Sequence, residues 1–179
     1  MKILKNLTLV FVLMIFLGCS KNDKNTVERT FAELSGNWEA TSYEYEGNTA
    51  YRSITTDENW NTSFFGAGWL LDFNIIFTES PNDFSVTGNH NVDHYFTDKD
   101  GQEFFYYANL ERSESGTYTR NSNTSLTFNE SGVYKQGTIQ ELDETTLKFS
   151  TSESSSETNS DNILISTIRT ETYILSRIN

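Results

Sequence analysis

The sequence has few of the residues on which most enzyme chemistry depends. Its 179 residues include one cysteine and two histidines, and no glycine-rich phosphate-binding loop. A single cysteine excludes an internal disulfide, and so few histidines leave little for metal sites or nucleophilic catalysis. Basic residues are also scarce, since 13 Lys and Arg stand against 25 Asp and Glu, a net charge of −12. Phosphate backbones repel so acidic a chain, and we expect no nucleic acid partner.

Long apolar runs are absent except at the N-terminus. Residues 1–18 have the pattern of a secretory signal, with Lys2 and Lys5 followed by an apolar run from Leu7 to Leu17. The run is shorter than the roughly 20 residues that a transmembrane helix needs. It is followed by Gly18 and then by the only cysteine, Cys19. We therefore expect residues 1–18 to be removed as a signal peptide.

The segment Phe16-Leu17-Gly18-Cys19 resembles the lipobox of bacterial lipoproteins, although Phe16 replaces the usual leucine. The alternative is an incidental cysteine at a signal-peptide junction. The resemblance implies that Cys19 is acylated, and several acyl chains together anchor a protein stably where one is marginal. We expect residues 19–26, which are polar, to form the tether. The expected location is the outer membrane, on its periplasmic or its outer surface.

The remaining residues, 27–179, are predicted to form one β domain preceded by a short helix. Thr26 is predicted to cap a helix over residues 27–34. After Gly36, about ten short strands alternate with turn signals, and one proline with no long helix favours an antiparallel barrel. Ser-rich residues 150–162 are predicted to form a loop. The expected turns are Glu46-Gly47-Asn48, Gly88-Asn89, Asp100-Gly101, Ser115-Gly116 and Ser131-Gly132.

The clearest strand covers residues 69–78. Alternate residues of a strand share one face, so this strand predicts an inward row that forms core or lines a cavity. The row consists of Trp69, Leu71, Phe73, Ile75 and Phe77. Aromatic residues make up 14% of the chain. They are explained by a filled barrel core, by a ligand-lined cavity, or by a surface platform that stacks on sugar rings.

The segment Leu34-Ser35-Gly36-Asn37-Trp38 resembles the Gly-x-Trp start of a lipocalin. In lipocalins this Trp packs at the closed end of the barrel against a basic residue near the end of the last strand, which here corresponds to Arg177. Ser115-Gly116-Thr117-Tyr118 and residues 142–149 extend the similarity to the lipocalin-like lipoproteins of Bacteroidetes. The resemblance implies an up-and-down barrel closed by Gly36, Trp38 and Arg177, with room for a cavity at its open end and no catalytic residues.

One cluster has the residue types of a metal site, His90-Asn91-Val92-Asp93-His94. Residues four apart on a strand lie about 13 Å from each other, so both histidines join one site only if a turn at Gly88-Asn89 brings them together. No third soft ligand is near, and we predict no metal site. No nucleophile motif or matched carboxylate pair is present either. We predict no enzyme activity and no cofactor.

Two functions remain for such a domain. The first is a monomeric carrier that binds a small apolar or amphipathic ligand inside the barrel. The second is a cell-surface accessory module with a filled barrel, which binds a glycan or a protein through exposed aromatic residues. A carrier requires an apolar pocket among the inward residues. A surface module requires outward Tyr or Trp residues gathered on one face.

Overall fold

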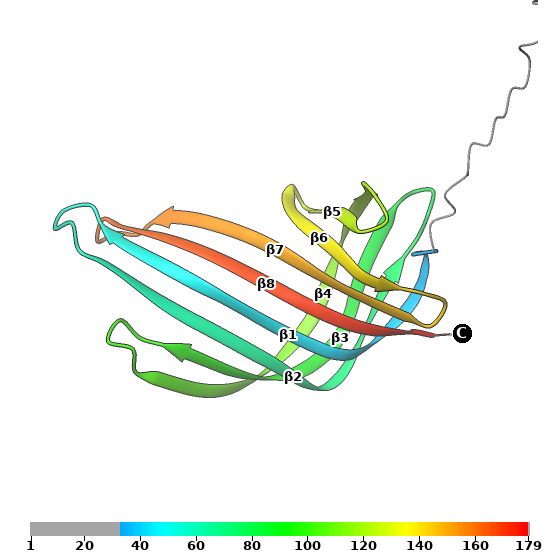
Figure 1. The fold of residues 1–179 in the computed structure, drawn as a ribbon, viewed down its shortest axis with the longest axis horizontal. Coiled ribbons are helices and arrows are strands. Elements are labelled where there is room, and N and C mark those ends of the chain that lie inside the picture. The colour runs from blue at the N-terminus through cyan, green and yellow to red at the C-terminus, as the bar shows by residue number, and fades with distance from the viewer. Residues whose placement is uncertain (1–32, 179) are drawn as a thin grey trace, which may run out of the picture. The chain divides into compact units, whose positions relative to one another are not determined.

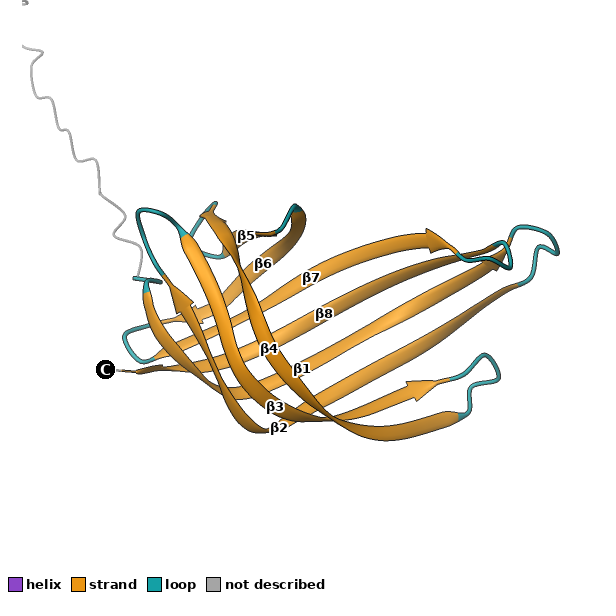
Figure 2. Ribbon diagram, turned by 180° about the vertical axis from the view of Figure 1, so that it is seen from behind, coloured by secondary structure: helices purple, strands orange, loops and turns teal. Residues whose placement is uncertain are grey.

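Eight strands account for most of residues 33–178, the part of the chain that the computed structural model describes. Each strand pairs antiparallel with the next, and β1 also pairs with β8, which closes the sheet into a barrel (Figure 1; Figure 2). The prediction of an all-β, antiparallel barrel is confirmed. The strands are β1 (Gly36–Ser53), β2 (Asn59–Phe77), β3 (Asp83–Thr97), β4 (Glu103–Arg120), β5 (Ser125–Glu130), β6 (Val133–Leu142), β7 (Thr146–Thr158) and β8 (Ile163–Ile178).

The strands are fewer and longer than predicted because three glycine-containing turn signals lie inside strands. Gly47, Gly88 and Gly116 belong to β1, β3 and β4. At Gly88 the φ angle is +128°, and a Cβ would collide with the backbone of β2, so glycine here permits close approach of two strands. The signals at Gly101 and Gly132 do mark turns, both with positive φ.

The Ser-rich segment is also mostly strand. The prediction of a loop over residues 150–162 is wrong through Thr158, because β7 pairs with β8 up to Thr158↔Leu164. Serine side chains are short enough to sit on an exposed strand, and here the paired neighbour supplies the backbone hydrogen bonds. Only the four residues between β7 and β8 form the connection.

The predicted inward row of β2 is interrupted by a β-bulge. Phe73, Ile75 and Phe77 are buried in the core, and Leu71 is half-buried against it. Trp69, in contrast, is 43% exposed, so its predicted inward position is wrong. The β2–β3 register shifts between Trp69 and Asp72, and Leu70 has a φ of +48°. The extra residue reverses which face the next side chains occupy.

The ring of eight paired strands is complete only at one end of the barrel. β4 pairs with β5 only from Thr117 to Arg120, and β6 reaches β7 only as far as Ser152. Figure 1 shows the β1–β2, β3–β4 and β7–β8 hairpins projecting beyond the short β5–β6 hairpin. The projecting part is therefore an open-sided curved sheet in the order β4-β3-β2-β1-β8-β7.

Several predictions concern residues outside 33–178. These are the signal peptide (1–18), the tether (19–26) with Cys19, and all but the end of the predicted helix (27–34). Glu33 and Leu34 have no regular secondary structure, and the Leu34 side chain is buried in the core. Within the described residues, no helix has the length and apolarity needed to cross a membrane.

Candidate functional site

The three residues proposed to close the barrel lie together where the first and last strands meet. Trp38 and Arg177 are directly opposite in the β1–β8 register, and the Arg177 guanidinium carbon lies 4.2 Å from the indole centroid. Trp38 is fully buried, and its Nε1 donates to the Leu34 carbonyl at 3.0 Å. Gly36 has a φ of +142°, and a Cβ there would strike Arg177. A stacked cation–π pair thus covers this end of the core.

The barrel interior is filled by side chains. Phe77 makes ring contacts with Tyr118, Phe128 and Phe149 at centroid distances of 5.4–6.3 Å. The interior cavity beside these rings has a volume of only about 30 Å³. A cavity of that size holds one or two water molecules, whereas small-molecule pockets measure about 300–1,000 Å³. The inward residues Phe73, Ile75 and Phe77 are therefore core in this conformation.

A charged network crosses the interior above this core. The Arg112 Nε lies 2.7 Å from a Glu114 oxygen, and Arg112 Nη2 donates to the Tyr173 hydroxyl at 3.0 Å. Tyr173 in turn donates to Glu171 at 2.7 Å, and Arg169 lies 2.8 Å from the other Glu171 oxygen. Burial alone would raise the pKa of Glu171, but Arg169 and Arg112 hold it below its usual value. The interior charges are thus neutralised by one another.

The two histidines point into the barrel at different levels and do not form a metal site. His90 is completely buried against Tyr43 and Phe73, and neither of its ring nitrogens has a hydrogen-bond partner. His94 Nδ1 is hydrogen-bonded to the Tyr45 hydroxyl at 2.5 Å. Among residues 33–178, no three His, Cys, Asp or Glu side chains gather as metal ligands. The predicted turn at Gly88-Asn89 is strand, so it cannot fold the histidines together.

Aromatic side chains also gather on the outside of the barrel wall. Phe65, Tyr95 and Phe105 lie directly opposite one another on β2, β3 and β4. Their ring centroids are 6.4 Å and 5.0 Å apart, and the three residues are 40%, 46% and 57% exposed. Cross-strand aromatic pairs contribute about 0.2–1 kcal/mol each, which is small beside the cost of leaving three rings in water.

Two further rings extend this outer aromatic surface, which we define as Phe65, Trp69, Tyr95, Phe105 and Tyr107. Tyr107 is opposite Asp93 in the β3–β4 register, and the Trp69 Nε1 donates to the Asp93 carboxylate at 3.0 Å. The hydrogen bond fixes the exposed indole in one orientation. The bulge at Leu70 is therefore what places Trp69 on this surface.

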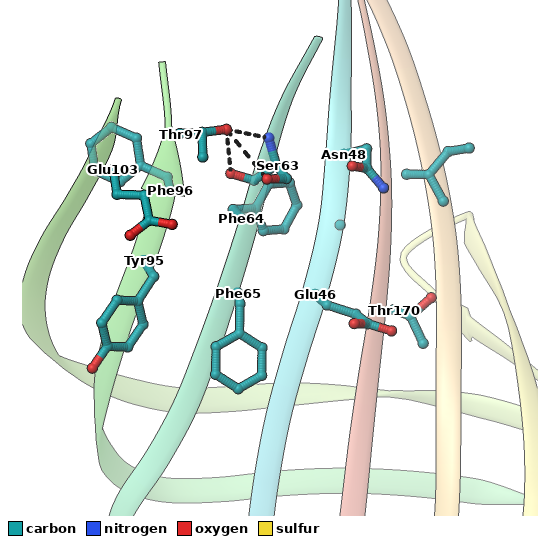
Figure 3. Close-up of a pocket in the computed structure, with 12 residues that line it drawn as sticks. Glu46, Asn48, Ser63, Phe64, Phe65, Tyr95, Phe96, Thr97, Glu103 and Thr170 are labelled. Carbon is teal, nitrogen blue, oxygen red and sulfur yellow. Dashed lines mark hydrogen bonds between the residues drawn. The ribbon is translucent and has the colours of Figure 1, made fainter. Parts of the chain in front are cut away.

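An open groove of about 600 Å³ lies at Phe65 and Tyr95 of this outer aromatic surface (Figure 3). Figure 3 shows Tyr95, Phe65, Glu46 and Thr170 side by side, from adjacent strands. Polar groups surround the rings, including the carboxylates of Glu46 and Glu103 and the side chain of Asn48. The lining residues are Glu46, Gly47, Asn48, Ser63, Phe64, Phe65, Tyr95, Phe96, Thr97, Glu103, Ile168 and Thr170.

The groove was only partly foreseeable from the sequence. The consecutive aromatics Tyr95-Phe96 and Phe104-Phe105-Tyr106-Tyr107 must place rings on both faces of their strands, because successive side chains alternate. This pattern shows which residues of one strand share a face, but not which residues of other strands lie beside them. The positions of Glu46 and Thr170 beside these rings follow only from the barrel register. Comparison with protein-family models, curated proteins and solved structures found no match to this chain.

Proposed function

We propose that this protein is a lipid-anchored, lipocalin-like module whose outer wall binds a neutral glycan. The observation that carries the proposal is the groove over β1, β2, β3 and β8, in which exposed rings of β2 and β3 lie beside polar side chains of β1 and β8. The small interior cavity favours this function over a carrier of apolar ligands. The proposal includes no catalysis and no cofactor.

Sugars match the chemistry of the groove. A pyranose ring has an apolar C–H face that stacks on an aromatic ring, and its hydroxyls need donors and acceptors at the edge. Phe65 and Tyr95 provide two apolar ring faces, inclined to each other by 31°. The carboxylates of Glu46 and Glu103 accept hydrogen bonds, and the Asn48 amide both donates and accepts. A net charge of −12 disfavours acidic polysaccharides, so the proposed ligand is uncharged.

The lipocalin-like part of the proposal rests on the closed end of the barrel. Trp38, Gly36 and Arg177 form one contact there, as the resemblance implies. The anchoring part rests on the resemblance of residues 16–19 to a lipobox. A lipid anchor at Cys19 would hold the glycan-binding wall close to a membrane.

The test is glycan-array screening of the full chain in detergent, followed by calorimetry with the glycans that bind. The double variant Phe65→Ala/Tyr95→Ala removes the rings, and we expect its affinity to fall at least tenfold. Tyr134→Ala is the matched control, because Tyr134 is an exposed aromatic residue on β6 outside the groove. Its affinity should equal that of the wild type.

Two results would reject the proposal. The first is an absence of neutral-glycan binding, or binding that the double variant retains in full. The second is an apolar molecule found by native mass spectrometry on protein purified from its own host, and kept by the double variant. That second result would restore the carrier function.

A further inference from the structure

The β4 strand has a long edge that no other strand covers. β4 pairs with β3 from Glu103 to Thr117, but it pairs with β5 only from Thr117 to Arg120. Among the described residues, no strand pairs with the other edge of residues 103–116. Such an edge presents unpaired N–H and C=O groups, and it can bind another strand.

The register identifies which residues present these groups. The Tyr118 N–H donates to the Asn82 carbonyl at 2.9 Å, on the side of β3. In an antiparallel strand, successive residues direct their N–H and C=O groups to opposite sides, and the β3–β4 register has no shift. The odd-numbered residues therefore direct their backbone groups toward the open edge. Those beside the aromatic stretch are Phe105, Tyr107 and Asn109.

The side chains in the middle of this edge do not protect it. Natural edge strands are usually blocked by charged residues, Pro or bulges, and residues 104–110 contain no charged residue and no Pro, although Glu103, Glu111, Arg112 and Glu114 flank them. Four consecutive aromatic residues, Phe104 to Tyr107, are exposed instead. The other uncovered edge, residues 153–158 of β7, consists of Ser, Thr and Glu. The two open edges thus differ in chemistry, and only β4 offers an apolar strand-pairing surface.

We propose that two copies of this chain pair through β4, antiparallel, about a twofold axis at Tyr106. The axis runs perpendicular to the sheet, so inward residues oppose inward residues and the odd-numbered backbone groups of both copies meet. Phe105 then lies opposite Tyr107 of the second copy, and Glu103 opposite Asn109. The aromatic pair is favourable across strands, and the Glu103–Asn109 pair sets no like charges against each other.

The sequence of β4 favours this register over the one centred on Tyr107. An axis at Tyr107 would place Glu103 opposite Glu111 of the second copy, which sets like charges against each other. An isologous contact uses the same edge of both copies, so it ends at a dimer and does not grow into a fibre. We take the occupant to be a second copy of this chain because, in this register, residues 103–109 pair their own aromatic side chains with each other and set no like charges opposite each other.

The pairing would also enlarge the outer aromatic surface. The row Phe65–Tyr95–Phe105 of one copy would continue into Tyr107 of the second copy. By symmetry, the same row of the second copy would continue into Tyr107 of the first. The dimer does not rest on glycan binding, because its test measures association alone.

Sedimentation of the full chain in detergent tests the dimer. Tyr107→Lys places a charge on the edge, and we expect its dimer dissociation constant to rise at least tenfold. Tyr134→Lys is a close control, since both tyrosines are 66% exposed and Tyr134 lies on β6. A wild-type chain that sediments as a monomer would overturn the inference, as would equal effects of the two variants.

Cysteine cross-linking tests the register. In a Cys19→Ala background, which removes the only native thiol, Tyr106→Cys places two thiols opposite each other across the axis. Directly opposed, non-hydrogen-bonded residues have Cα atoms about 4.5 Å apart, within reach of a disulfide. Oxidation should therefore give a covalent Tyr106→Cys dimer and little from Tyr107→Cys. The reverse order would refute the proposed axis.

Discussion

At Trp38 the first strand, β1, contacts the end of the last strand, β8. Its indole is buried between the core and Arg177, and it is held by the Leu34 carbonyl. Arg177 also donates to the carbonyls of Ser35 and Glu33, each at 2.7 Å. One side chain on β8 thus fixes the segment that precedes β1. Stability at this end depends on these few contacts.

Trp38→Ala should reduce the free energy of unfolding by about 3–5 kcal/mol, because it truncates a buried aromatic residue and leaves a cavity. Urea denaturation measures the change. Trp69→Ala is the comparison, since its indole is 43% exposed and lies outside the core, and it should cost clearly less than Trp38→Ala. If the two variants lose similar stability, Trp38 has no special part in closing the barrel.

His90 should make folding sensitive to acid. Burial, with Arg112 adding to the effect, lowers its pKa to about 4 from the ordinary 6.5. Between these values the unfolded chain binds a proton that the folded chain excludes. The free energy of unfolding therefore falls as pH falls through this window, by up to about 3 kcal/mol.

The variant His90→Phe should lose this part of the pH dependence. Urea midpoints at about pH 7 and about pH 5 should lie closer together in the variant than in the wild type. His94 and Glu171, whose pKa values are also lowered, remain in both proteins and cancel in the comparison. An unchanged difference between the two midpoints would show that His90 is not buried neutral.

At the level of strands, β2 and β3 show how glycine and bulges set the register. Gly88 allows β3 to approach Asp72 and Phe73 of β2, and the bulge lies beside it at Leu70. Sequence patterns predicted the alternation of Phe73, Ile75 and Phe77. They did not predict the reversal at Trp69, because an extra residue in one strand is visible only against its partner.

Gly88→Ala should therefore destabilise the barrel more than Gly101→Ala. Both positions have positive φ, at +128° and +79°, so each substitution strains the backbone. Only at Gly88 does the new methyl group meet a neighbouring strand, whereas the space at Gly101 is open. We expect about 1 kcal/mol at Gly101 and clearly more at Gly88, measured by thermal unfolding. Equal losses would contradict the close approach.

For the whole molecule, composition and turn chemistry predicted a barrel but not how it is filled. The antiparallel class follows from short links and alternating residues. The charged network does not, because Arg112 and Tyr173 meet only after the barrel closes. The sequence carries a faint sign of it in the polar residues two apart on one strand, Arg112 with Glu114 and Arg169 with Glu171. Such spacing puts charges on one face without saying which face is inward.

Membrane attachment is also a property of the whole chain. If Cys19 is acylated, Cys19→Ala should move the protein from the membrane fraction to the soluble fraction after cell lysis. The loss follows because several acyl chains supply the anchoring free energy. Immunoblotting of the two fractions measures it, with Cys19 intact as the reference. If the variant stays in the membrane fraction, acylation of Cys19 does not anchor the protein.

Most of the groove is formed by the outward faces of strands whose inward faces form the core. Ile75 and Phe77 of β2 stabilise the interior, while Phe65 of the same strand faces the groove. Mutations in the groove therefore cost little folding stability, since outward side chains bury little area. Natural variation can change what the wall recognises while the barrel stays intact. Related chains are then expected to share their inward residues and to diverge at the outward positions of β1 to β4.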